Sequence, residues 1–94
     1  MNPTEYRDEN GKLHRPWQEG PALLYEDGTF HYYEHGKRHR PWQEGPATIY
    51  PDGLRIYFEH SQKHRPVSDG PARVLSDKTE EYWENGILLW SVQP

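Results

Sequence analysis

The apolar and aromatic residues lie in short runs along the chain, and no window spaces them as one face of a helix would require. The runs are about five or six residues long, a normal length for a β-strand. Turn-forming dipeptides such as Asp27-Gly28 and Asp52-Gly53 separate them, and Asp-Gly is among the strongest hairpin signals. The pattern predicts first strands at about 22–26, 47–51 and 72–76, and second strands at about 29–34, 54–59 and 79–84.

The pattern repeats along the chain. His-Arg-Pro-Trp-Gln-Glu-Gly-Pro-Ala occupies residues 14–22, recurs unchanged at 39–47, and returns with substitutions at 64–72, a step of 25 residues each time. A fixed period of this size is typical of a repeat protein, in which each unit covers its neighbour's open edge. We expect one all-β domain over 1–94, a single-layer antiparallel meander of about three and a half hairpin repeats. Its parts are a half repeat at 4–13, repeats at 14–38, 39–63 and 64–86, and an apolar C-terminal cap at 87–94.

The hairpin fixes which side chains share a face. If Asp27-Gly28 is a two-residue loop, Leu24 lies opposite His31 and Ala22 lies opposite Tyr33, and residues that are paired in this way share a face. One face, expected to be the more buried, then carries Ala22, Leu24, Tyr33, Ala47, Ile49, Ile56, Phe58, Ala72, Val74 and Trp83. The other face carries a tyrosine ladder together with Phe30 and Leu75; its tyrosines are Tyr25, Tyr32, Tyr50, Tyr57 and Tyr82.

The run Tyr-Tyr-x-x-Gly-Lys-x-His-Arg, followed by Gly-Pro-Ala and then Asp-Gly, resembles the MORN-type repeats. It is most similar to their divergent His-Arg…Gly-Pro-Ala variants in phage, bacterial and large-virus proteins, and the resemblance covers roughly residues 4–90. It implies an elongated meander with one hairpin per repeat. It also implies a scaffold or interaction surface, because members of this family mostly serve in that way.

Composition narrows the classes of function. Of the 94 residues, 32% are hydrophobic and 14% aromatic, so the chain is expected to fold around rings with a thin aliphatic core. The net charge of −4 argues weakly against nucleic acid or an anionic membrane as the partner. There is no cysteine for a disulfide or thiol chemistry. No signal peptide or membrane span is apparent in the sequence, so a cytoplasmic protein is expected, in the host cytoplasm if it is phage-encoded.

The sequence predicts neither a metal site nor an enzyme. His14, His39 and His64 occupy one repeat position, and two strands per repeat separate such equivalents by roughly 10 Å. A shared zinc ion needs each nitrogen within about 2.1 Å, so we expect these histidines to bond to backbone groups or nearby carboxylates. Nearly every polar group has a repeat-related copy, whereas an active site is a unique constellation. We expect no cofactor.

A basic stripe is the remaining charged feature. Seven of the eleven lysines and arginines lie in the three equivalent loops, at 12, 15, 37, 38, 40, 63 and 65. Acidic residues precede and follow each loop, which favours charge pairing between repeats. The stripe could instead hold a polyanion, with Trp17 and Trp42 beside it as stacking surfaces. Trp17 and Trp42 are otherwise expected to cover the aliphatic face.

These observations favour a non-catalytic protein-binding module. Tyrosine, tryptophan and arginine dominate binding hot spots. The candidate binding residues are Tyr25, Tyr32, Tyr50, Tyr57, Tyr82, Arg15, Arg40, Trp17 and Trp42. An unpaired outer strand could add to a partner's sheet or form a homodimer. A specific version is a phage-encoded, anti-CRISPR-like inhibitor of a host defence enzyme. The alternative is binding of a polyanion, nucleic acid or lipid headgroup through the His-Arg loops.

Overall fold

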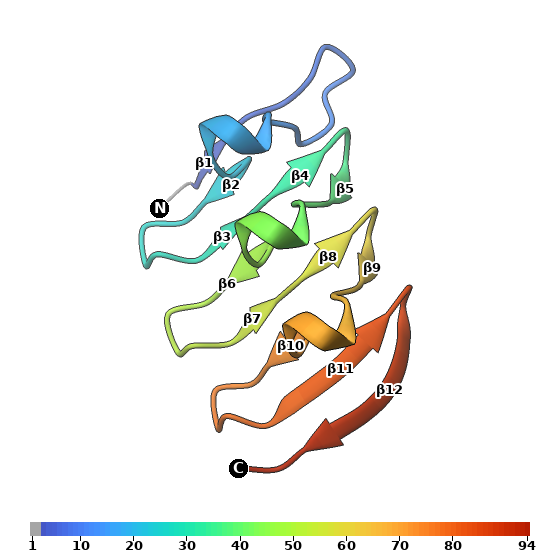
Figure 1. Ribbon diagram of the computed structural model, residues 1–94. Coiled ribbons are helices and arrows are strands. Elements are labelled where there is room, and N and C mark those ends of the chain that lie inside the picture. Colours follow the sequence, from blue (N-terminus) through green and yellow to red (C-terminus); the bar gives the residue numbers. More distant parts are fainter. Residues whose placement is uncertain (1–2) are drawn as a thin grey trace.

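The computed structural model describes residues 3–94, which form an open antiparallel sheet of eight strands (Figure 1). The strand order is β1-β2-β3-β6-β7-β10-β11-β12, in which every neighbour is antiparallel. Two short ladders, β4-β5 and β8-β9, extend it on one side. The all-β antiparallel meander predicted from the sequence is confirmed, and the Arg-Pro loops recur at the 25-residue step. None of the helices in residues 3–94 is both long and apolar enough to span a membrane.

Most elements are short. The strands are β1 Thr4–Glu5, β2 Leu23–Leu24, β3 Phe30–His31, β4 Tyr33–Glu34, β5 Lys37–Arg38, β6 Thr48–Ile49, β7 Arg55–Ile56, β8 Phe58–Glu59, β9 Gln62–Lys63, β10 Arg73–Val74, β11 Glu80–Glu84 and β12 Ile87–Val92. Three 3-10 turns, η1 Trp17–Glu19, η2 Trp42–Glu44 and η3 Val67–Asp69, precede the Gly-Pro dipeptides. The sequence pattern did not predict these turns, which lie on one side of the sheet (Figure 1).

The predicted hairpin register is wrong by one residue. The Tyr25 N–H donates to the Thr29 carbonyl (2.9 Å) and the Gly28 N–H to the Tyr25 carbonyl (3.1 Å), so the loop has three residues. Gly28 takes a left-handed conformation (φ 96°), as a type I turn followed by a glycine bulge requires. The loop pairs Leu24 with Phe30, where a two-residue loop would pair it with His31. The hairpins at Tyr50–Leu54 and Leu75–Thr79 have the same hydrogen bonds.

This shift moves the second strands to the opposite face from the one predicted, because side chains alternate along a strand. Phe30 and Tyr32 now share the face of Ala22 and Leu24, and their rings meet edge to face at 5.7 Å. Tyr25 lies on the other face with His31. The single tyrosine ladder predicted from the sequence therefore does not exist: Tyr25 and Tyr50 face one side, and Tyr32 and Tyr57 face the other.

The predicted second strands at 29–34 and 54–59 each divide in two, whereas the third, at 79–84, forms the continuous strand β11. The strand at 29–34 shows the division. Its first half pairs with the next repeat, and its second half turns back through a tight loop, as Tyr33 and Glu34 do when they pair with Arg38 and Lys37. The Tyr32 N–H bonds to the Ala47 carbonyl at the division (2.7 Å).

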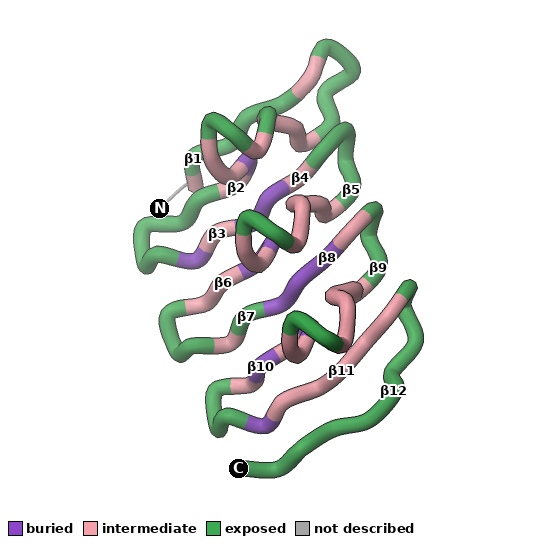
Figure 2. Tube along the Cα trace, viewed as in Figure 1, coloured by how far each residue is buried: buried purple, intermediate pink, exposed green. Residues whose placement is uncertain are grey.

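The core is a narrow column through the middle of the sheet (Figure 2). Its central cluster is Tyr32, Ala47, Ile56 and Phe58, against which Trp17, Phe30 and Leu54 pack. The repeated alanines, Ala22, Ala47 and Ala72, are completely buried.

The C-terminal segment covers the last hairpin and leaves an edge of its own. β12 pairs with β11 along its length and covers that strand, but no strand within residues 3–94 pairs with its outer edge. All six of its residues are exposed. The apolar run expected to close the repeat array therefore presents a new open edge.

Candidate binding surfaces

The arginine of each His-Arg-Pro loop joins its own repeat to the one before it. Arg40 stacks on the Tyr32 ring (4.2 Å from guanidinium carbon to ring centre) and donates to the Pro46 carbonyl (3.1 Å). The same contacts join Arg15 to Tyr6 and Pro21, and Arg65 to Tyr57 and Pro71. A guanidinium over a ring face is attracted by the ring's quadrupole.

The glycine of the Gly-Pro-Ala motif makes room for this arginine. At Gly45 a Cβ atom would lie 2.7 Å from Nη1 of Arg40, and at Gly70 it would lie 2.6 Å from Nη1 of Arg65. The backbone at both glycines is also in the positive-φ region (134° and 133°). The recurring motif therefore has a structural explanation, which places the predicted binding residues Arg15 and Arg40 in internal contacts.

The repeat-related histidines link the start of each repeat to the turn near its end. Nδ1 of His39 accepts the His60 backbone N–H (3.1 Å), and the two rings stack at 4.3 Å. His14 and His64 accept the equivalent N–H groups of His35 and Asn85, each at 3.0 Å. Burial, followed by the nearby His60, lowers the pKa of His39, which favours the neutral ring that this bond needs. Bonding to the backbone, as predicted, is confirmed.

No group of three or more histidine, aspartate or glutamate side chains in residues 3–94 is arranged to hold a metal ion.

The predicted charge pairing of the basic loops is wrong. The ion pairs within residues 3–94 are Arg7–Glu5, His35–Asp8 and Arg73–Glu81, and none of them involves a lysine or arginine of the stripe. Aromatic rings take the place of the acids. Arg38 lies over Phe58 (5.3 Å) and donates to the Tyr33 hydroxyl (3.2 Å).

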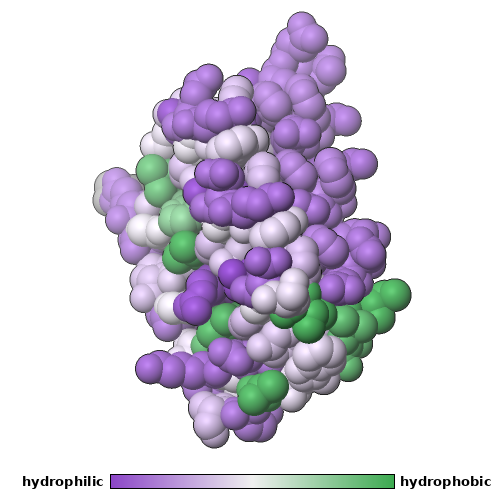
Figure 3. Space-filling view, in the orientation of Figure 1, coloured by the Kyte–Doolittle hydropathy of each residue, from purple (hydrophilic) through white to green (hydrophobic). Residues whose placement is uncertain are grey.

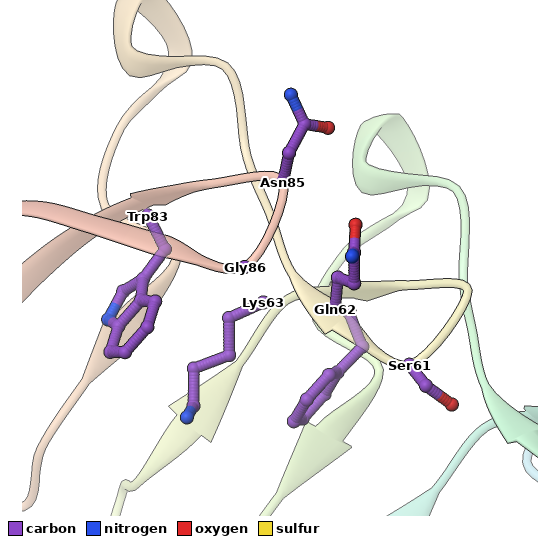
Figure 4. A pocket seen from close by; sticks show the side chains of 7 residues that line it. Ser61, Gln62, Lys63, Trp83, Asn85 and Gly86 are labelled. Carbon is purple, nitrogen blue, oxygen red and sulfur yellow. The ribbon is translucent and has the colours of Figure 1, made fainter.

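Lys63 and Trp83 make the last of these cation–ring contacts, 4.4 Å apart (Figure 4). They line a shallow cleft of about 310 Å³ together with Phe58, Ser61, Gln62, Asn85 and Gly86. The ammonium group of Lys63 is thereby partly engaged by the protein's own ring.

The tryptophans begin the 3-10 turns. Trp17 packs against the core cluster, as expected of a residue that covers the apolar face. Trp17 and Trp42 are both half-buried, and each has a carbonyl that accepts the N–H of the following glycine, Gly20 or Gly45. Val67 replaces tryptophan in the third copy, where its N–H donates to the Glu84 carboxylate (3.1 Å).

The candidate tyrosines do not form one ladder, although Tyr25 and Tyr50 meet around His31. Tyr32 and Tyr57 are buried beneath Arg40 and Arg65. Tyr82 stacks on Trp90 (4.8 Å). Tyr25 is exposed and Tyr50 half-exposed, and both border His31.

Sequence reasoning missed two features. One is His31, which is 6% exposed and bonds through Nδ1 to the Thr48 hydroxyl (2.9 Å). The sequence feature that could have identified His31 is a break in the repeat, because Ile56 and Glu81 occupy the equivalent positions. The other is the apolar surface of β12, where the exposed large side chains are Ile87, Leu88, Leu89, Trp90 and Val92. Figure 3 shows apolar atoms gathered at the β11–β12 turn.

Comparison of the chain with family models, with curated proteins and with solved structures gives no match. The MORN-type resemblance therefore stays a prediction.

Proposed function

We propose that the protein is a non-catalytic protein-binding module that holds an extended segment of another protein along the free edge of β12. The observation that carries the proposal is the exposure of this strand: its five large apolar side chains are 43–64% exposed, and its outer edge pairs with no strand in the part of the chain that the structure describes. A free strand edge offers backbone hydrogen bonds to an incoming strand, and the alternating side chains supply specificity.

The contrast between the two sheet edges supports a binding role for β12. β1 spans only two residues, and the Glu5–Arg7 ion pair lies at this edge. Charge and short length are the usual means by which proteins prevent unwanted pairing at an edge strand. β12 spans six residues and contains no charged side chain. Its one irregularity is a register shift opposite Tyr82 and Trp83.

The chemistry of β12 also indicates the kind of partner. An uncharged, apolar strand gains most from an extended segment with apolar side chains. A second copy of the chain could supply such a segment through its own β12, which makes a homodimer one outcome of the experiment below.

The repeated residues support a scaffold role for the remainder of the sheet. The arginines and histidines of the loops make contacts within the protein, as Arg40 and His39 do. Because these contacts occupy the guanidinium groups, they give no support to the polyanion alternative. The inhibitor of a defence enzyme stays a prediction from the sequence.

Capture of partners from cell lysate, with quantification by mass spectrometry, tests the proposal. The informative variant is Ile87→Lys with Leu89→Lys, because these side chains are exposed and take no part in the Tyr82–Trp90 stack. The matched control is Lys12→Glu with Lys37→Glu, two exposed residues of the basic stripe. We expect the β12 variant to lose the captured protein and the control to retain it. The reverse result would support the polyanion alternative and sink the proposal.

Light scattering of the purified chain separates the two kinds of partner. A dimer that becomes a monomer in the β12 variant assigns the edge to self-association. A monomer in both leaves the edge available to another protein.

A further inference from the structure

A second site lies at the hairpin side of the sheet, between the first and second Asp-Gly loops. Tyr25, Asp27, Thr29, His31 and Tyr50 line an open cleft of about 320 Å³ there. The ring centres of Tyr25 and Tyr50 lie 6.3 Å and 5.7 Å from that of His31, and their planes stand at 82° and 80° to the imidazole. Three aromatic rings thus border one small space.

A hydrogen bond to the neighbouring strand fixes the position of the His31 ring. Its Nδ1 bonds to the hydroxyl of Thr48, a completely buried residue on the neighbouring strand β6. Residues 31 and 48 are direct partners in the β3–β6 ladder, so the sheet itself sets the spacing between the cleft's base and its tyrosines. The cleft is therefore preorganised.

The residues of this cleft are not all repeated in the next hairpin. One repeat later, Tyr25 and Tyr50 become Tyr50 and Leu75, and His31 becomes Ile56. The scaffold thus needs neither the histidine nor the second tyrosine at these positions. A constellation that breaks the repeat while the fold continues is a better candidate for a site than any recurring group.

The charges around the cleft favour a cation. The Asp27 carboxylate accepts the Thr29 backbone N–H (2.8 Å), and this bond lowers the pKa of Asp27, so the group is ionised at neutral pH. Burial, followed by the charge of Arg38, lowers the pKa of His31, which leaves its ring uncharged at neutral pH. The neighbouring Arg38 donates to the Tyr33 hydroxyl (3.2 Å) and keeps its charge, so the carboxylate of Asp27 is the group that attracts a cation to the rim.

We propose that this cleft binds the alkylammonium group of a lysine side chain, methylated or not, on a protein partner. Aromatic faces attract a cation through the ring quadrupole, and cages of this kind recognise methylated ammonium groups. Asp27 adds an opposite charge at the rim. The site is independent of β12, so it stands or falls separately from the proposed strand addition.

Titration of the labelled protein with two short peptides, followed by NMR, tests the inference. One peptide carries trimethyllysine, and the other carries its neutral isostere, in which carbon replaces the ammonium nitrogen. We expect the charged peptide to bind roughly tenfold more tightly, with shifts confined to residues 25–31 and 48–50. Equal affinity for both peptides, shifts elsewhere, or no binding at millimolar peptide would overturn the proposal.

The next repeat suggests the variants and the control that test the cleft. Tyr50→Leu introduces the residue that the next repeat carries at Leu75, and Asp27→Asn keeps an oxygen that can accept the Thr29 N–H. Asp52→Asn is the matched control, because Asp52 makes the same bond to Leu54 one hairpin later (2.9 Å). Both cleft variants should weaken the charged peptide severalfold, and the control should not. Unchanged affinity in both folded cleft variants contradicts the site.

Two further probes distinguish the possible sources of the ammonium group. Choline represents a lipid headgroup, and a peptide with unmodified lysine represents a protein side chain.

Discussion

At the scale of single residues, the recurring motif is explained by one interlocking unit. Arg40 lies between the Tyr32 ring and the Pro46 carbonyl, and Gly45 leaves the space that the guanidinium fills. An arginine that appears in every copy thus stabilises the scaffold.

We therefore predict that Arg40→Gln destabilises the protein by about 2 kcal/mol, because it removes a cation–ring contact and a charged hydrogen bond. Urea unfolding measures the change. Lys37→Gln is the control, since Lys37 is exposed and should change stability by less than about 0.5 kcal/mol. Equal effects of the two substitutions would show that Arg40 is a surface residue in solution.

Substitution of Lys78 is expected to stabilise the protein. It holds φ at 75° in the loop position where Gly28 and Gly53 sit, a conformation that strains a side chain by about 1–2 kcal/mol. Lys78→Gly relieves this strain but adds freedom to the unfolded chain, so we expect a net stabilisation of about 0.5–1 kcal/mol. Thermal unfolding checks it, and a lower melting temperature would refute it.

His31 and His39 make stability depend on pH. Their folded pKa values lie below the ordinary value of 6.5, so the unfolded chain binds protons first as the pH falls. Their contribution is present above about pH 6.5 and is lost as the pH falls through the lower folded values. We expect the urea midpoint to drop between pH 7.5 and 5, and the drop to shrink in His39→Asn. An equal drop in the variant would remove His39 from the explanation.

At the scale of elements, the sequence predicted the strands and their order but not how they register. The Asp-Gly dipeptides fixed where the hairpins lie, and the 25-residue period fixed their number. A two-residue and a three-residue loop are both compatible with Asp-Gly, however, and the choice between them decides which face Tyr32 and Tyr57 occupy. The 3-10 turns were invisible because three residues are too few to show a period.

The cleft around His31 could not be predicted because the register of the hairpin was uncertain. The contact of His31 with Thr48 requires the observed register, so it could not be found from the predicted faces. The exposure of β12 was missed for another reason. An apolar run at the end of a repeat array is compatible with a strand whose side chains are buried and with one whose side chains stay exposed.

The last hairpin separates a structural role from a binding role. Trp90 stacks on Tyr82, so Trp90→Ala should cost about 1–2 kcal/mol of stability. Ile87 is 64% exposed, and Ile87→Lys should cost less than about 0.5 kcal/mol. Urea unfolding of both variants tests this. A large loss with Ile87→Lys would mean that β12 is covered in the isolated chain.

At the scale of the whole molecule, the recurring residues hold the sheet together, and the proposed binding sites lie at residues that do not recur. Contacts such as Arg40 to Tyr32 join neighbouring repeats into one sheet 40 Å long, and these contacts recur along it. Among the residues that depart from the repeat are those of the aromatic cleft around His31 and of the apolar edge of β12. We infer that the scaffold holds these two places in a fixed relation.

Hydrogen exchange of the captured complex, compared with that of the free chain, tests the central claim most directly. If a partner strand adds to β12, the amides of residues 87–92 that face outward become hydrogen-bonded, and their exchange slows by more than about tenfold. The basic loops at 12–15 and 37–40 should exchange as they do in the free chain. Slowed exchange confined to those loops, with β12 unchanged, would contradict the account.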